Sequence, residues 1–366
     1  MENQVLLIKP ASSSCNMRCK YCFYTDLSNA RTVGNYGMMR LETLEALVRA
    51  VFAETTGFCS FGFQGGEPTL AGLEFFRTFI ALEKQYNTKH LRVAHSIQTN
   101  GLLLDDQWAE FFREHKFLVG LSIDADKSVH DALRLDAAGK GTHNRCLAAA
   151  RLLKKHNVEF NILSVVTKWL ASHPDKTWQF YRKHDFQHVQ LIPCIDETFS
   201  GEHYALDAKT YGRFLCRLFD LWYADYLKGA YISVRTFDNY IRILAGYPPE
   251  NCAMAGVCCV YALVEADGGI YPCDFYATDA YLLGNIHEQK LSDLLQNEVA
   301  LGFSTPSHSV DPACKNCEFY PICRGGCRRD REVSGGALGL NQYCASYKQF
   351  FSHALPRLVQ IARRQR

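Results

Sequence analysis

The grouping of the sixteen cysteines constrains this chain more than any other feature of its sequence. Cys15, Cys19 and Cys22 follow a C-x3-C-x2-C spacing close to the N-terminus. Eight more lie in the last third of the chain: Cys252, Cys258, Cys273, Cys314, Cys317, Cys323, Cys327 and Cys344. Thiols this dense indicate metal sites in a reducing compartment, where disulfides do not persist. The fold therefore has to bring separate cysteine loops together around metal.

The five remaining cysteines are Cys59, Cys146, Cys194, Cys216 and Cys259. The first four stand singly within apolar or helical patterns, where we expect each to be a small buried hydrophobe. Cys259 is different because it is adjacent to Cys258 and could be mistaken for the ligand.

Composition narrows the class of protein. The 366 residues allow one large domain, or one with a smaller appendage, and 48% hydrophobic residues can bury a substantial core. A net charge of +2 gives no electrostatic case for nucleic acid. We expect no membrane span and no secretory signal, because no stretch has the necessary apolar length or layout. A cytoplasmic location is the expectation.

The first two thirds of the chain alternate strand-like and helix-like segments. Strands are expected over Val5–Ile8, Cys59–Phe63, Leu91–Ile97, Phe117–Ile123, Val158–Val166 and His188–Ile192. Helices are expected over Leu41–Ala53, Leu73–Tyr86, Asp105–His115, His143–Lys155, Pro174–His184 and Tyr204–Leu227. Parallel strands need such crossovers, and six units are too few for the usual eightfold barrel. The fold class predicted is α/β, a partial (β/α)6 barrel over residues 1–235.

The pattern changes after residue 235, so residues 236–366 are expected to form a second, smaller domain organised by metal. It should contain a hairpin over Tyr261–Pro272, which turns at Asp267-Gly268-Gly269. A last helix is expected over Asn341–Arg363.

The first cysteine group can hold three irons of a 4Fe–4S cube and leave the fourth iron open for chemistry. A structural zinc site is the alternative, but such sites normally have four ligands. The group lies at the end of the first strand and resembles the signature of the radical S-adenosylmethionine (SAM) superfamily. That resemblance implies that the open iron binds SAM. Tyr21 matches the aromatic residue before the third cysteine.

Two further strand ends fit the same resemblance. Gly65-Gly66-Glu67-Pro68 resembles the family's GGEP motif, which contacts the methionine amino group of SAM. Ser122, at the end of the fourth strand, would contact the ribose or carboxylate of SAM, or else cap the following helix. Both lie where barrel active sites are built.

The C-terminal cysteines resemble the SPASM domain, whose eight ligands match two fully ligated 4Fe–4S clusters. A pair of zinc sites would use the same number of ligands. By resemblance, the first auxiliary cluster takes Cys252, Cys258, Cys273 and Cys327. The second takes Cys314, Cys317, Cys323 and Cys344. The cofactors implied are thus SAM and three 4Fe–4S clusters.

Nearly the whole chain resembles the anaerobic sulfatase-maturating enzymes, in motifs such as Phe63-Gln64-Gly65-Gly66-Glu67-Pro68 and Tyr271-Pro272-Cys273-Asp274-Phe275-Tyr276. The resemblance makes Asp274 the catalytic base, although a carboxylate beside a cluster can also be a solvated group. Tyr24 and Gln64 would approach the target residue or cofactor, unless they serve packing. Only fourteen residues precede Cys15, so we expect no leader-binding domain.

The implied reaction oxidises a cysteine or serine of an unfolded or nascent sulfatase polypeptide to Cα-formylglycine without oxygen. A 5′-deoxyadenosyl radical would take a hydrogen from the β-carbon, Asp274 would take the side-chain proton, and the first auxiliary cluster would take an electron. Ferredoxin or flavodoxin would be the reductant. One alternative is a SPASM maturase that forms a thioether or carbon crosslink in a ribosomal peptide. Another is an iron–sulfur electron-transfer or redox-sensing protein.

Overall fold

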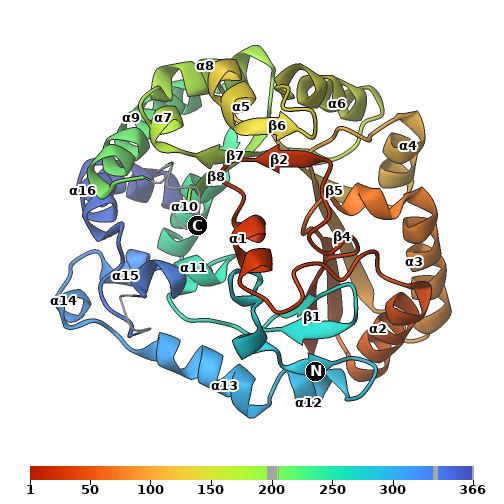
Figure 1. Cartoon of the computed structure of the whole chain (residues 1–366). Coiled ribbons are helices and arrows are strands. Elements are labelled where there is room, and N and C mark those ends of the chain that lie inside the picture. Colours follow the sequence, from red (N-terminus) through yellow and green to blue (C-terminus); the bar gives the residue numbers. More distant parts are fainter. Residues whose placement is uncertain (196–203, 205, 333–336, 365–366) are drawn as a thin grey trace. The chain divides into compact units, whose positions relative to one another are not determined.

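The structure is a computed structural model that describes residues 1–195, 204, 206–332 and 337–364 (Figure 1). It divides into two compact units. Unit 1 comprises Met1–Ile123, Asp131–Phe160 and Val260–Phe303, and unit 2 comprises Asp124–His130, Asn161–Cys259 and Ser304–Arg366. Each unit is built from separated segments, so the expected boundary between residues 235 and 236 stays a prediction.

Unit 1 is organised by a sheet in the order β12-β11-β10-β1-β3-β4-β5. These strands are β1 (Asn3–Ile8), β3 (Phe58–Phe63), β4 (Arg92–Thr99), β5 (Phe117–Ser122), β10 (Ala262–Val264), β11 (Gly269–Tyr271) and β12 (Gly284–Asn285). From β10 to β5 all neighbours are parallel, whereas β11 and β12 are added antiparallel. Parallel order requires a crossover after each strand, and helices supply it.

The crossover helices of unit 1 cover the outside of its strands (Figure 1). They are α2 (Leu41–Glu54), α3 (Leu73–Tyr86), α4 (Asp106–Glu114) and α6 (His143–Lys155). Shorter elements are α1 (Phe23–Asn29), α12 (Leu291–Leu294), α13 (Glu298–Ser304), β2 (Met17–Cys19), β6 (Arg134–Asp136), η1 (Pro68–Ala71), η2 (Asp274–Tyr276) and η3 (Asp279–Tyr281). Aromatic rings fill the layer between α3 and the sheet. The Phe63 ring centroid lies 4.9 Å from Phe76 and 5.1 Å from Phe79.

Unit 2 contains a parallel group of β7 (Phe160–Val166), β8 (His188–Pro193) and β9 (Ser233–Val234). Its helices are α5 (Lys127–Leu133), α7 (Lys168–Ala171), α8 (Pro174–Lys183), α9 (Ala208–Leu227), α10 (Arg235–Leu244), α11 (Cys252–Ala255), α14 (Pro312–Lys315), α15 (Tyr320–Cys323), α16 (Cys344–Ala362), η4 (Thr305–His308) and η5 (Arg329–Arg331). The two longest, α9 and α16, lie side by side, with Ser346 Oγ donating to the Ala208 carbonyl. No helix among the described residues has the length and apolar character needed to cross a membrane.

All six expected strands are present, as β1, β3, β4, β5, β7 and β8. Two helix starts were expected too early. Helix α9 begins at Ala208 rather than Tyr204, because the Asp207 side chain accepts the Thr210 N–H and caps the helix there. Residue 205 lies outside the described residues. Helix α16 begins at Cys344 rather than Asn341. The Asn341 side chain accepts the Tyr343 N–H and so forms a turn before the helix.

The expected hairpin is confirmed as β10 and β11, with Gly268 in its turn at φ +91°. Beyond the prediction, β10 also pairs in parallel with β1, so that Leu6 stands opposite Ala262. The hairpin thereby joins the sheet of unit 1. Of the single cysteines, Cys59, Cys146 and Cys194 are buried as expected, and Cys216 is half-buried.

A buried group of charges fastens the hairpin to the start of the chain. Lys9 follows β1, Glu265 follows β10, and one Glu265 carboxylate oxygen lies 2.7 Å from Lys9 Nζ and 2.6 Å from an Arg31 nitrogen. Burial by itself would raise the pKa of Glu265, but the two cations hold it below its usual range. The carboxylate is therefore charged, and it compensates two cations that are themselves shielded from water.

Replacing Glu265 tests this arrangement. Glu265→Gln is expected to lower the free energy of unfolding by about 3 to 5 kcal/mol, because it leaves buried cations without their counter-charge. Urea unfolding of the apoprotein, followed by circular dichroism, measures the change. Glu74→Gln is the matched control, because the Glu74–Arg77 pair is exposed and its loss should leave stability almost unchanged. Equal effects of the two substitutions would contradict this account.

Candidate functional site

The first cysteine group lies in unit 1, in the loop between β1 and α1. Cys19 ends β2, which pairs antiparallel with β6, and Cys22 directly precedes α1. The Met17 N–H donates to Cys15 Sγ at 3.3 Å. Burial raises the pKa of the Cys15 thiol to about 11, and this hydrogen bond opposes the rise. A thiol that is this hard to ionise alone requires a bound metal to become a thiolate.

Tyr21 lies inside the same loop and is buried. The guanidinium of Arg134, on β6, lies 5.3 Å from the centroid of the Tyr21 ring. Tyr21 thus packs against the strand that pairs with the cysteine loop. Ser122, another expected SAM contact, is half-buried as the last residue of β5.

The Gly-Gly turn after β3 packs directly on the loop before Cys15. Gly66 N–H donates to the Ser12 carbonyl at 2.9 Å, and Glu67 N–H donates to the Ser14 carbonyl at 2.8 Å. A β-carbon on Gly66 would lie 2.0 Å from the Ser14 carbonyl oxygen. Gly65 has φ +117°, a conformation that glycine adopts without strain. Both glycines therefore let the turn touch the backbone that carries Cys15.

Glu67 is buried, and its carboxylate ties this turn to the end of β4. One oxygen accepts from the Thr69 hydroxyl at 2.6 Å and the Thr99 hydroxyl at 2.8 Å, and the other accepts from the Asn100 N–H at 2.8 Å. Burial raises the pKa of Glu67, and these hydrogen bonds oppose the rise. The arrangement fixes the GGEP turn against the end of β4.

Asn100 extends this connection to the cysteine loop. Its side-chain amide donates to Asn16 Oδ1 at 2.7 Å and lies 4.0 Å from Cys15 Sγ. Asn100 directly follows Thr99, the last residue of β4. Its contact with Asn16 depends on folding and could not be read from spacing.

A polar group built on Gln64 unites three expected site residues in unit 1. Gln64 Nε2 donates to the Tyr24 hydroxyl and, at 3.1 Å, to Asp274 Oδ2. The other Asp274 oxygen, Oδ1, accepts from the Tyr261 hydroxyl. The Lys9 ammonium lies over the Tyr24 ring, 5.2 Å from the ring centroid. Residues that are 210 positions apart in the chain thus share one hydrogen-bonded group.

The two tyrosines of this group are neutral donors and acceptors. Burial, and then the Asp274 carboxylate, raise the pKa of Tyr24 well above its usual range. The same causes, in the same order, raise the pKa of Tyr261. Tyr261 was not expected from the sequence. The only signal is its place before β10, which the hairpin register puts opposite Cys273.

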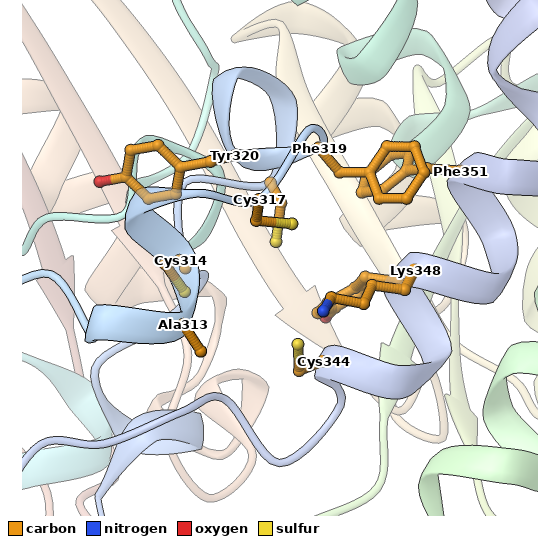
Figure 2. A pocket seen from close by; sticks show the side chains of 11 residues that line it. Ala313, Cys314, Cys317, Phe319, Tyr320, Cys344, Lys348 and Phe351 are labelled. Carbon is orange, nitrogen blue, oxygen red and sulfur yellow. The ribbon is translucent and has the colours of Figure 1, made fainter.

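Unit 2 holds the second expected auxiliary set around one small pocket (Figure 2). Cys314 lies on α14, Cys323 ends α15 and Cys344 begins α16, and Figure 2 shows the sulfurs of Cys317 and Cys344 facing the same space. Phe319, Tyr347 and Phe351 line the rest. Four thiols around an apolar space fit a 4Fe–4S cluster. Within the described ranges, no three His, Cys, Asp or Glu side chains are grouped to hold a single metal ion.

The other auxiliary set is divided between the units. Cys252, Cys258 and Cys327 belong to unit 2, whereas Cys273 belongs to unit 1, so the expected set of four stays a prediction. Cys258 N–H donates to Ser307 Oγ at 2.8 Å. Burial raises the pKa of Cys327 to about 12, and the charge of Cys258 adds to this. A hydrogen bond with Cys252 lowers the pKa of Cys259, the exposed neighbour, to about 6.

Comparison with known proteins identifies the class. The model of the Radical SAM superfamily matches residues 10–170, and that of an iron–sulfur cluster-binding domain, SPASM, matches residues 257–318. The chain thus has a radical SAM core and a C-terminal SPASM domain, and the fold class expected from the sequence is confirmed. The cofactors of such an enzyme are SAM and 4Fe–4S clusters. In this chain the clusters number three.

Full-length relatives identify the family. A cysteine-type anaerobic sulfatase-maturating enzyme of Clostridium novyi is 44% identical, covering 99% of this chain and 98% of its own. One from Clostridium perfringens is 46% identical, covering 98% of each. The solved structure of native anSMEcpe with bound AdoMet and Cp18Cys peptide has a TM-score of 0.95 and 44% identity, with both chains fully covered. The chain belongs to the anaerobic sulfatase-maturating enzymes.

The contact at Gly66 predicts a specific loss of iron. Gly66→Ala should displace the loop of Cys15, because the new β-carbon would clash with the Ser14 carbonyl, and iron should fall from about twelve to about eight atoms per chain. Iron and sulfide analysis after anaerobic reconstitution measures this. Gly302→Ala is the control, since Gly302 lies within α13, where alanine is favoured, and a β-carbon there has open space. Full iron in the Gly66 variant would refute the prediction.

Substituting Cys258 and Cys259 separately tests which of these adjacent residues is a cluster ligand. If Cys258 is a ligand, Cys258→Ala should lose about four irons per chain, while Cys259→Ala should keep all of them. Matched reconstitutions analysed for iron and by Mössbauer spectroscopy distinguish the two. The reverse outcome would assign the ligand role to Cys259.

Proposed function

We propose that this chain oxidises a cysteine side chain of a sulfatase polypeptide to Cα-formylglycine by radical SAM chemistry without oxygen. The observation that carries the proposal is the Gln64 amide, which joins Tyr24 and the Asp274 carboxylate. The relatives named cysteine-type are 44% and 46% identical, whereas one named serine-type is 32% identical, which favours cysteine over serine as the target. An unfolded or nascent segment is the substrate we expect.

The proposed cofactor sites follow the strand ends. Cys15, Cys19 and Cys22 would hold the cluster that binds SAM, with Tyr21, Gly65, Gly66, Glu67 and Ser122 lining the SAM site. When bound, SAM and the clusters supply a radical that removes a hydrogen atom from the target β-carbon and an acceptor for the electron left behind. Gly65 and Gly66 let the backbone approach closely, and Glu67 keeps the turn fixed through four hydrogen bonds.

Asp274 is the proposed base. Its Oδ2 accepts one hydrogen bond, from Gln64, and retains a lone pair for a substrate proton, whereas its Oδ1 accepts from Tyr261 and from the Cys273 thiol. A carboxylate held in this way can accept the thiol proton of the target cysteine without reorienting. Loss of that proton, together with a hydrogen atom and an electron, leaves a thioaldehyde that water converts to the aldehyde.

Tyr24 and Gln64 are the proposed substrate contacts. Because Gln64 is the donor in their hydrogen bond, the Tyr24 proton remains available for the sulfur or backbone of a bound peptide. The Phe23 ring, 4.1 Å from the Tyr24 ring centroid, and the Lys9 ammonium hold the Tyr24 ring in place. The orientation of the phenol is thus set before the substrate binds.

We also infer a cytoplasmic location and a ferredoxin or flavodoxin as reductant. Eleven expected ligand thiols favour a reducing compartment, and one-electron chemistry requires a one-electron donor. Nucleic acid and membrane are not expected partners. The first auxiliary cluster would use Cys252, Cys258, Cys273 and Cys327, and the second Cys314, Cys317, Cys323 and Cys344. The division into residues 1–235 and 236–366 belongs to the same proposal.

The test is an anaerobic assay of the reconstituted enzyme with dithionite, SAM and sulfatase-derived peptides that carry cysteine or serine at the target position. Mass spectrometry is expected to show the aldehyde together with 5′-deoxyadenosine, with the cysteine peptide converted faster. Deoxyadenosine without an aldehyde would overturn the proposal and direct attention to another peptide modification. A crosslinked peptide product would do the same.

Asp274→Asn tests the base. Peptide oxidation is expected to slow by about 10² to 10⁴, because an amide cannot accept the thiol proton, whereas SAM cleavage should persist. Aldehyde and deoxyadenosine, quantified in the same reaction, separate the two effects. The control is Asp279→Asn, which alters an exposed carboxylate bonded to Thr32 in the same unit. An aldehyde rate in the Asp274 variant equal to that of the control would exclude the base role.

A further inference from the structure

The Tyr261 hydroxyl lies between the proposed base and an expected cluster ligand. Tyr261 precedes β10, and because Leu263 pairs with Tyr271 in the hairpin, Tyr261 stands opposite Cys273. Its hydroxyl donates to Asp274 Oδ1, lies 3.4 Å from Cys273 Sγ, and accepts the Asp274 N–H at 3.1 Å. All three contacts fall within unit 1.

The two acceptors around this hydroxyl are very close to each other. Cys273 Sγ lies 3.5 Å from Asp274 Oδ1. If Cys273 binds iron, its sulfur has no proton, so that sulfur and the carboxylate become two electron-rich acceptors in contact. The single Tyr261 proton is then the donor that both share. Such a donor lowers the repulsion between them and fixes their relative position.

A hydrogen bond to a ligand sulfur also changes the cluster. The donor stabilises the reduced cluster more than the oxidised one, because reduction places more negative charge on the sulfurs. The same hydroxyl therefore influences both the orientation of the carboxylate and the reduction potential of any cluster bound at Cys273.

We propose that Tyr261 is a positioning residue whose hydroxyl holds Asp274 in place as a base and, through the same proton, raises the reduction potential of the cluster ligated by Cys273. The inference rests on the proposed function, in which Asp274 is the base and Cys273 is a ligand. In this inference, the hydroxyl of Tyr261 links the proton acceptor, Asp274, to the electron acceptor, the cluster at Cys273.

The first experiment measures the potential without turnover. Tyr261→Phe is introduced into a chain in which Cys15, Cys19 and Cys22 are alanine, so that only auxiliary clusters form. Redox titration followed by electron paramagnetic resonance should then show one auxiliary potential shifted to a more negative value. The other, from the cluster at Cys314, Cys317, Cys323 and Cys344, should be unchanged and serves as an internal reference.

The second experiment uses the complete enzyme. Tyr261→Phe should lower kcat for peptide oxidation by about tenfold, the size expected for one lost hydrogen bond to a charged group, with KM little changed. Deoxyadenosine formed per aldehyde should rise, because SAM cleavage does not use Tyr261. Tyr86→Phe is the matched control, since the Tyr86 hydroxyl also donates to a carboxylate, that of Glu45, in the same unit.

Both auxiliary potentials unchanged in Tyr261→Phe would overturn the inference, as would kinetics equal to those of Tyr86→Phe. An unmodified chain that makes no formylglycine would instead refute the proposed function, which separates the two failures. If Tyr261→Phe does not assemble its clusters, a fluorinated tyrosine at position 261 keeps the ring and strengthens the O–H donor. The potential should then shift in the positive direction, and an unchanged value would overturn the inference.

Discussion

The pairing of β1 with strands on both sides is the constraint on which the site depends. β1 pairs with β3, which leads to the Gly65-Gly66 turn, and with β10, which comes more than 250 residues later. Without the second pairing, Asp274 would have no reason to lie beside Gln64. One central strand therefore brings the cysteine loop, the GGEP turn and the proposed base into one unit.

Much of this arrangement could be predicted from the sequence, because it follows from local patterns. Alternation of apolar strands and amphipathic helices identified the six strands, and the turn at Gly268 identified the hairpin. Short cysteine spacings identified the metal-binding loops. Where the prediction was wrong, side-chain caps were responsible, as with Asp207 at the start of α9. The position of a cap depends on one hydrogen bond, and the spacing of apolar residues does not predict that bond.

The contacts that complete the site could not be predicted, because they join residues that are distant in the chain. The parallel pairing of β10 with β1 leaves no trace in the composition of either strand. The same applies to Glu265, whose buried position between Lys9 and Arg31 is visible only after folding. Tyr261 acquires its role from the register of a hairpin, and its place at the start of that hairpin is the only sequence feature that sets it apart from other tyrosines.

Glu265 has charged partners and Asp274 has uncharged donors. This difference explains how a buried ion group and the proposed base can lie in the same unit. Lys9 and Arg31 bind Glu265, whereas the donors to Asp274 are an amide, a phenol and a thiol. A carboxylate in direct contact with a cation holds its negative charge too firmly to serve as a general base. Glu265 keeps both cations engaged, so the unit can bury positive charge near Tyr24 while the hydrogen-bond donors to Asp274 are uncharged. The fold thus orients the proton acceptor with hydrogen bonds that leave it able to accept a proton.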